Sequence, residues 1–115
     1  MTLEDLVAVL GRRDVAALGA VLDPDVVLVS DGGGQVVTPL RPVRGAGAVA
    51  RLVAALVTAD SVLSTASVNT RPGVVVRRDG RACAVIVPAL ESSAVTHVWV
   101  VLNPDKLERW HRVPG

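Results

Sequence analysis

The sequence predicts an α+β domain in which a curved antiparallel sheet carries three helices packed on one face. Three observations support this class: 115 residues are enough for one compact core, half of them are apolar, and they include no phenylalanine or tyrosine. Valine, leucine and alanine must therefore fill the interior, and β-branched side chains favour strands. No linker, internal repeat or low-complexity tract divides the sequence, so residues 1–115 are expected to form a single domain.

The first predicted elements are two helices that form a hairpin. Leucine and valine side chains recur at helical spacing over residues 3–10, and Thr2 with Asp5 has the spacing of a capping box. Asp14 can cap the second helix, and the Asp23-Pro24-Asp25 segment ends it.

Two strands and a third helix follow. The β-branched runs at residues 26–30 and 36–40 predict strands, and the glycine-rich segment between them has the composition of a hairpin loop. Residues 49–57 place apolar side chains at positions i, i+3, i+4, i+7 and i+8, which predicts an amphipathic helix.

The remainder predicts an antiparallel meander and a short terminal helix. The meander has strands at residues 62–69, 73–77, 81–90 and 94–102. The first two of these strands are separated by Arg71-Pro72, and Asn103 can cap a helix that begins at Pro104. The predicted order is therefore ααββαββββ, and the end of the sheet that the helices leave open is expected to form a pocket for a ligand.

Charge and hydropathy exclude several classes of protein. The net charge is +1 and the arginines are scattered along the chain, without the concentrated basic face that nucleic-acid binding requires. The apolar stretches are shorter than the ~20 residues of a membrane-spanning helix, and the first residues lack the pattern of a secretion signal. We therefore expect a cytoplasmic protein that binds neither nucleic acid directly nor a membrane.

Cysteine and histidine are too rare for disulfide or metal chemistry. The lone Cys83 excludes an internal disulfide and is expected to be a buried thiol of the core. His97 and His111 are too few and too far apart for a zinc site. The sequence therefore predicts no metal and no cofactor.

Two separated motifs carry a resemblance to a known family. They are Asp31-Gly32-Gly33-Gly34-Gln35-Val36 and Asn103-Pro104-Asp105-Lys106-Leu107, and residues 22–30 and 42–45 extend the likeness to nearly the whole chain. The sequence resembles the SnoaL-like carboxy-terminal domain of SigJ-type extracytoplasmic-function sigma factors from actinobacteria. This resemblance implies the cone-shaped SnoaL-like fold of nuclear transport factor two and ketosteroid isomerase.

The resemblance also implies a regulatory role. In such sigma factors the domain follows two promoter-binding domains, and its glycine loop and tail motif are thought to adjust transcription. The implied interaction residues are Gly32, Gly33, Gly34, Gln35, Asn103, Pro104, Asp105, Lys106 and Leu107. Met1 directly precedes the first predicted helix, so the chain is expected to be an excised domain or a stand-alone relative without the DNA-binding parts. Its expected partners are the transcription machinery or a small hydrophobic ligand.

Asp31 is the candidate catalytic residue. It stands where the wider isomerase superfamily holds its proton-shuttling aspartate, and burial in an apolar pocket would raise its pKa. A cofactor-free isomerase, cyclase or dehydratase acting on a hydrophobic molecule is thus the alternative function. The favoured interpretation is that Asp31 accepts backbone hydrogen bonds in the glycine hairpin, because an enolate needs donors and the chain has no tyrosine. The chain is therefore expected to be non-catalytic.

Four residues are candidates for a ligand pocket. His97, Trp99 and Asn103 share one face of the last predicted strand, and Arg41 precedes the third helix at the expected rim. Each of three candidates also has an interpretation without a ligand. His97 could simply be exposed, Trp99 could belong to the core or to a dimer surface, and Arg41 could be a solvated side chain. The uncovered side of the sheet predicts a homodimer.

Overall fold

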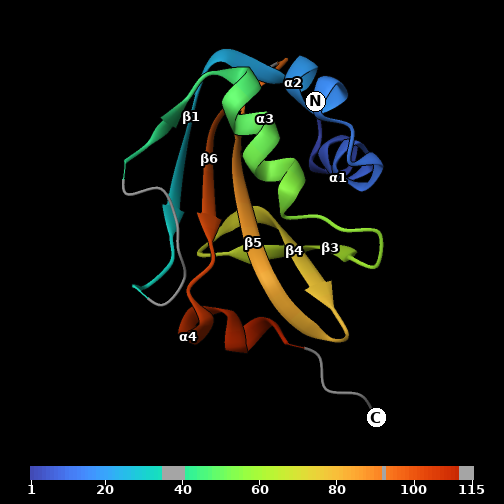
Figure 1. Ribbon diagram of the computed structural model, residues 1–115, viewed down its shortest axis with the longest axis vertical. Helices are drawn as coiled ribbons and strands as arrows, with labels where there is room; N and C mark the ends of the chain where they lie inside the picture. Colours follow the sequence, from blue (N-terminus) through green and yellow to red (C-terminus); the bar gives the residue numbers. More distant parts are fainter. Residues whose placement is uncertain (35–40, 92, 112–115) are drawn as a thin grey trace.

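Six strands of the described residues form one sheet in the order β2-β1-β6-β5-β4-β3, and three helices cover one of its faces (Figure 1). The computed structural model describes residues 1–34, 41–91 and 93–111. The helices are α1 (Leu3–Arg12), α2 (Val15–Val21), α3 (Ala46–Ala55) and α4 (Pro104–Leu107), which continues into the 3-10 turn η1 (Glu108–Trp110). The strands are β1 (Leu22–Asp31), β2 (Val43–Arg44), β3 (Val62–Val68), β4 (Arg71–Arg78), β5 (Arg81–Leu90) and β6 (Val95–Val101). The predicted α+β class is confirmed.

Local capping explains where the first two helices begin. The Thr2 hydroxyl accepts a hydrogen bond from the Asp5 amide, and the Asp5 carboxylate accepts one from the Thr2 amide. The Asp14 carboxylate accepts a hydrogen bond from the Ala17 amide at the start of α2. These bonds satisfy donors that a helix start otherwise leaves unpaired, so both predicted caps are confirmed.

The sheet departs from the expected wholly antiparallel arrangement at one pair of strands. The meander β3-β4-β5-β6 is antiparallel as predicted, whereas β1 pairs in parallel with β6. Both strands are rich in valine, which favours a strand without specifying the direction in which it pairs. Figure 1 shows the arrowheads of β1 and β6 pointing toward the same end of the sheet, where α4 lies.

The edge beside β1 differs from the prediction. The strand predicted at residues 36–40 lies outside the described residues, and the segment that pairs with β1 is β2, which lies between that predicted strand and the predicted third helix. Strand β1 also begins earlier than predicted and includes Pro24. The proline is tolerated because the pairing of β1 with β6 is interrupted between Leu22 and Val27, so no ladder hydrogen bond is lost there.

The hairpin between β3 and β4 turns earlier than predicted. Asn69 and Thr70 form the turn with φ angles of 49° and 69°, and Arg71-Pro72 belongs to β4 instead of separating the strands. Two consecutive residues of positive φ give the twist that two-residue hairpins require, and asparagine accepts this conformation readily. Pro72 pairs only with the edge strand β3, so its missing amide leaves the ladder to β5 intact.

The sheet has an apolar core on each side. The inner face, defined as the side covered by α1, α2 and α3, packs leucines of the helices against alternating residues of the strands, such as Val74 and Val76. The outer face is the opposite side, where Val75, Val85 and Leu107 belong to a smaller cluster beneath α4 and η1. No helix among the described residues is long and apolar enough to cross a bilayer.

Cys83 does not join either core. Its side chain on β5 is only partly buried, and its sulfur lies 3.4 Å from Nε of Arg78. The prediction of a buried core thiol is therefore wrong. Its neighbours Ala82 and Ala84 are buried, Ala82 in the outer-face cluster and Ala84 in the inner-face core.

Candidate functional site

The glycine loop and the tail motif lie side by side at one end of the sheet. Because β1 and β6 are parallel, their carboxyl ends meet, with Asp31 opposite Val101 in the register. The amide of Leu102 donates a hydrogen bond of 2.7 Å to the carbonyl oxygen of Asp31. The loop that follows β1 and the segment that follows β6 therefore start from neighbouring points, although Asp31 and Asn103 are 72 positions apart in sequence.

Asn103 caps α4, as the sequence predicts. Its Oδ1 accepts a hydrogen bond of 3.1 Å from the Asp105 amide, and its carbonyl oxygen accepts bonds from the amides of Lys106 and Leu107. Pro104 occupies the first helical position, where its missing amide has no cost. The side chain of Leu107 is buried in the outer-face cluster, so the cap and the core together hold this short helix.

Gly33 lies directly against the Asn103 side chain. Its φ angle is 62°, and a Cβ placed on it would come within 2.3 Å of Asn103 Cγ. Both the backbone conformation and the close approach therefore require glycine at this position. The contact joins the glycine loop to the cap of the tail helix.

A charged pair closes the same contact. Lys106 Nζ lies 2.5 Å from Asp31 Oδ2, and the Gly33 amide donates a hydrogen bond of 3.0 Å to Asp31 Oδ1. We refer to Asp31, Gly33, Asn103 and Lys106 as the loop-tail patch. The side chains of Asp31 and Lys106 remain 37% and 63% exposed, so the pair is accessible to a partner.

The environment of Asp31 is the reverse of that of a pocket base. The hydrogen bond from the Lys106 ammonium lowers the pKa of Asp31, the Gly33 amide lowers it further, and the opposing effect of desolvation is outweighed. The condition for a raised pKa, burial in an apolar pocket, is therefore not met, because the carboxylate is accessible to solvent and ion-paired. The favoured interpretation, in which Asp31 accepts a backbone hydrogen bond within the glycine loop, agrees with the bond from the Gly33 amide.

Replacing Lys106 with glutamine should raise the pKa of Asp31 toward its ordinary value of 3.8, because the ammonium that stabilises the carboxylate is removed. An NMR titration of the Asp31 carboxyl carbon measures this shift. A carboxylate with a lowered pKa in the folded state stabilises the fold above its unfolded pKa, and this contribution is lost as pH falls through the folded pKa. The wild type should therefore exceed Lys106→Gln in stability at neutral pH and lose that advantage in acid.

Lys106→Arg is the matched control for this titration, because it keeps the positive charge beside the carboxylate. It should preserve the lowered pKa of Asp31. An Asp31 pKa that is the same in wild type and Lys106→Gln would contradict the assigned cause.

The other predicted interaction residues surround the loop-tail patch. Gly32 is buried, Gly34 is exposed with a φ angle of 74°, and Pro104 and Asp105 are exposed on α4. Gln35 lies outside the described residues.

The four predicted pocket residues do not meet at a single site, and only His97 and Trp99 contact each other. His97 and Trp99 are exposed on the outer face, where their rings stack with centroids 5.9 Å apart. Asn103 lies beyond the end of β6 in the loop-tail patch, and Arg41 is an exposed residue ahead of β2. Trp99 is 37% exposed, so simple core packing does not describe it.

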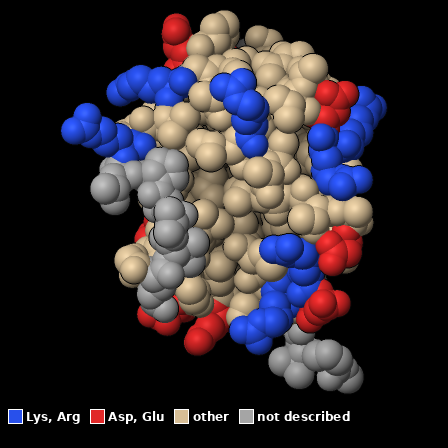
Figure 2. Space-filling model, viewed as in Figure 1, with Lys and Arg blue, Asp and Glu red and all other residues tan. Residues whose placement is uncertain are grey.

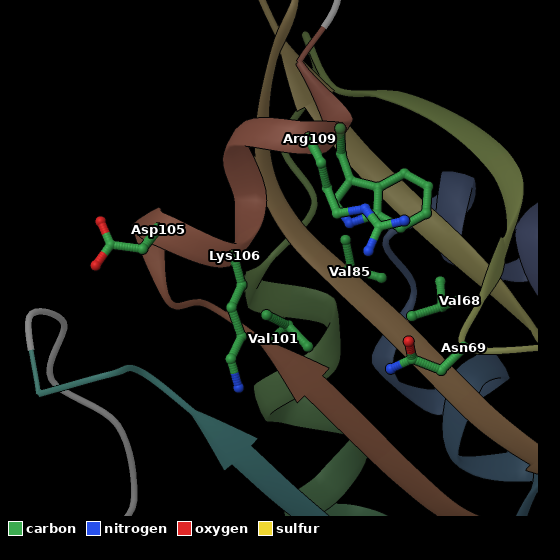
Figure 3. A pocket seen from close by; sticks show the side chains of 8 residues that line it. Val68, Asn69, Val85, Val101, Asp105, Lys106 and Arg109 are labelled. Carbon is green, nitrogen blue, oxygen red and sulfur yellow. The ribbon is translucent and has the colours of Figure 1, made fainter.

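Hollows on the outer face bring together Lys106 and Trp99, which the sequence singled out, with residues that it did not. One, of about 360 Å³, lies beneath α4 and η1 and is lined in part by Asn69, Lys106, Arg109 and Trp110 (Figure 3). A neighbouring hollow of about 430 Å³ includes Arg71 and Trp99. The adjacent Arg109 and Trp110 could have indicated a binding site from the sequence alone. Asn69 and Arg71 reach the hollows only because the chain turns at Asn69 and Thr70, which the sequence did not predict.

Charges are dispersed over the face with the helices. Figure 2 shows lysine and arginine side chains mostly around its rim, with acidic side chains between them. This agrees with the scattered arginines of the sequence.

Comparisons with known proteins identify the fold. No family model and no curated protein matches the sequence. The chain is similar to the crystal structure of the extracytoplasmic function sigma factor SigJ of Mycobacterium tuberculosis, with 28% identity and a TM-score of 0.66. This match covers 90% of the chain and 42% of that protein, so the chain spans less than half of the sigma factor's length.

Two further structures share the fold at lower identity. A steroid delta-isomerase from Pseudomonas aeruginosa has 18% identity and a TM-score of 0.61, covering 91% of this chain and 79% of that one. An NTF2-like protein from Cytophaga hutchinsonii has 16% identity and a TM-score of 0.58, and the match covers 93% of this chain and 95% of that one. The chain therefore has the NTF2-like, or SnoaL-like, fold, and it resembles the carboxy-terminal domain of the sigma factor SigJ.

Proposed function

We propose that the chain is a non-catalytic regulatory module that binds a protein of the transcription apparatus through the loop-tail patch. One observation carries this proposal: the two motifs that resemble the sigma-factor domain form a single contact, with Gly33 against Asn103 and Asp31 paired with Lys106. Two distant segments whose characteristic residues meet at one surface favour a shared role for that surface.

The exposure of the charged pair supports recognition over stability. An ion pair between exposed side chains contributes little to folding, because water screens it and both side chains lose freedom. Such a pair does present two opposite charges at fixed positions, which helps a protein partner to dock in one orientation. The similarity to a sigma factor at 28% identity supports a partner from the transcription apparatus.

The properties of Asp31 support a function that does not involve catalysis. A general base works best with a pKa near the working pH, whereas the pKa of Asp31 is lowered by Lys106. The chain also has no tyrosine to stabilise an enolate. The likeness to the steroid isomerase is one of fold, and a fold shared by many activities says little about any one of them.

Binding to purified RNA polymerase tests the proposal. The chain is immobilised, and core polymerase, polymerase with a bound sigma factor, and free sigma factor are passed over it. We expect saturable binding to at least one of them, weakened about tenfold or more by Asp31→Lys or Lys106→Glu. Arg51→Glu, an exposed change on α3, is the matched control and should bind normally.

A charge swap separates recognition from stability. The double variant Asp31→Lys with Lys106→Asp restores an ion pair of reversed polarity, so it should fold normally and still bind weakly. Thermal unfolding of every variant checks that the fold is retained. Absence of binding to all three preparations, or equal binding by Lys106→Glu and wild type, would overturn the proposal.

A further inference from the structure

The two hollows of the outer face form one groove. They share the lining residues Val68, Asn69 and Val101, so one continues into the other across β3 and β6. We refer to them together as the outer groove. Volumes of about 360 and 430 Å³ lie within the range of pockets that hold small organic molecules.

The floor of the outer groove is apolar. Valines of β3, β5 and β6 line it, including Val68, Val85, Val87 and Val101. Figure 3 shows Val68, Val85 and Val101 around the hollow beneath α4 and η1. An aliphatic floor of this kind favours the apolar part of a ligand, because burial removes both surfaces from water.

The walls of the groove carry two arginine-tryptophan pairs. The guanidinium of Arg71 lies 5.1 Å from the ring centroid of Trp99, and that of Arg109 lies 5.0 Å from Trp110. A guanidinium stacked on an indole keeps its N–H edge available for a carboxylate or phosphate. Both tryptophans of a chain that has no other large aromatic side chain therefore lie at this groove.

Among the described residues, no acidic side chain pairs with the two guanidinium groups of the groove. No carboxylate within residues 1–34, 41–91 and 93–111 forms an ion pair with Arg71 or Arg109, whereas Lys106 is paired with Asp31. Figure 3 shows the Asp105 carboxylate directed away from the other labelled side chains. An occupant that carries an acidic group would supply the missing charge.

We propose that the outer groove binds a small amphipathic anion as a free molecule, with its apolar body on the valines and its acidic group on Arg71 or Arg109. A neutral or cationic molecule of the same shape leaves both guanidinium groups without an anion. A second copy of the chain, packed face to face, brings the same unpaired cations toward one another. Lys106 borders both the outer groove and the loop-tail patch, but its ammonium is paired with Asp31, so this proposal is argued from Arg71 and Arg109 and does not rest on the protein-binding role of the patch.

Tryptophan fluorescence reports on this groove, because both tryptophans of the chain line it and the chain has no tyrosine. The probe is dodecanoate, kept below its micelle-forming concentration. We expect a saturable shift of the emission to shorter wavelength as the exposed indoles are covered. Acetate carries the negative charge without the alkyl chain, and dodecyltrimethylammonium carries the same alkyl chain with a positive charge. Neither compound should reproduce the shift.

Substitutions assign the binding to the groove. Arg71→Gln with Arg109→Gln should weaken dodecanoate binding about tenfold or more, because charged hydrogen bonds are lost. Arg51→Gln on α3 is the matched control and should leave the affinity unchanged. Trp99→Phe and Trp110→Phe, measured separately, show which pair receives the ligand.

Several results would overturn the proposal. The first is that dodecyltrimethylammonium binds as tightly as dodecanoate, and the second is that the double arginine variant binds dodecanoate with unchanged affinity. The third is that the protein binds anionic vesicles but not monomeric dodecanoate. A dimer in light scattering that Trp99→Glu dissociates would show that a second copy occupies the face instead. Because these tests need no transcription partner, their failure is distinguishable from failure of the proposed function.

Discussion

Replacing Gly33 with alanine should destabilise the protein by about 2 kcal/mol, because two costs coincide at this position. The left-handed backbone at φ 62° disfavours any side chain. The new methyl group would also displace Asn103 and break the hydrogen bond that its Oδ1 accepts from the Asp105 amide. Urea unfolding followed by circular dichroism measures the loss.

Gly34 supplies the matched control for this substitution. Its φ angle of 74° imposes the same backbone cost, yet a Cβ there would meet no atom of the described residues within 4 Å. Gly34→Ala should therefore lose only the backbone part, about 1 kcal/mol less than Gly33→Ala. Equal losses at the two glycines would contradict the proposed contact.

A double-mutant cycle isolates the contact itself. Asn103→Ala removes the cap and also removes the atoms that the new methyl group would meet. In the Asn103→Ala background, Gly33→Ala should therefore cost no more than Gly34→Ala does. A loss that is unchanged in this background would place the cost of Gly33→Ala in the backbone alone.

The elements that the sequence predicted correctly are those with strong local signals. The spacing of leucines over residues 3–10, the Thr2 cap and the Asn103 cap are all properties of neighbouring residues, and the structure confirms each of them. The strand at residues 81–90 was predicted with its observed bounds because a long β-branched and apolar run is unusual outside a sheet.

The pairing of β1 with β6 could not be predicted from the sequence. The spacing of valines in β1 and β6 does not say that they are neighbours, nor that they run in parallel. That pairing brings Asp31 beside Lys106, so the loop-tail patch became visible only in the structure. The two motifs were found by resemblance, while their contact follows from topology.

The outer groove was missed for a related reason. The ligand site was expected at the open end between the helices and the sheet, since three helices were the only large cover predicted. The short α4 and η1 instead fold over the outer face and create a second cluster with a hollow beside it. A four-residue helix has too few residues to reveal an apolar face by periodicity.

Arg77 explains how this terminal segment is held. The sequence does not distinguish it from the other scattered arginines, yet only 8% of it is exposed. Its Nε donates a hydrogen bond of 2.6 Å to the Trp110 carbonyl, and its Nη1 donates one of 2.6 Å to the Ser64 hydroxyl. One side chain on β4 therefore connects the end of η1 to the edge strand β3.

Replacing Arg77 with alanine should destabilise the protein by about 3 kcal/mol, because hydrogen bonds from a charged donor are lost and buried acceptors remain unpaired. The midpoint of thermal unfolding should fall by about 10 °C. The emission of Trp110 should also shift to longer wavelength in the folded protein as η1 loosens; Trp99→Phe makes Trp110 the sole reporter.

Two variants decide whether the geometry of Arg77 or its charge matters. Arg77→Lys keeps the charge but replaces the forked guanidinium with one ammonium, which cannot hold both acceptors at the observed positions, so it should recover only part of the stability. Arg78→Ala removes the exposed neighbouring arginine, which contacts Cys83, and should change the unfolding midpoint little. If Arg77→Ala unfolded at the same temperature as Arg78→Ala, the connection to Trp110 would contribute nothing. The terminal segment would then be held by Leu107 in the outer-face cluster and by the hydrogen bond from the Ala82 amide to His111 Nδ1.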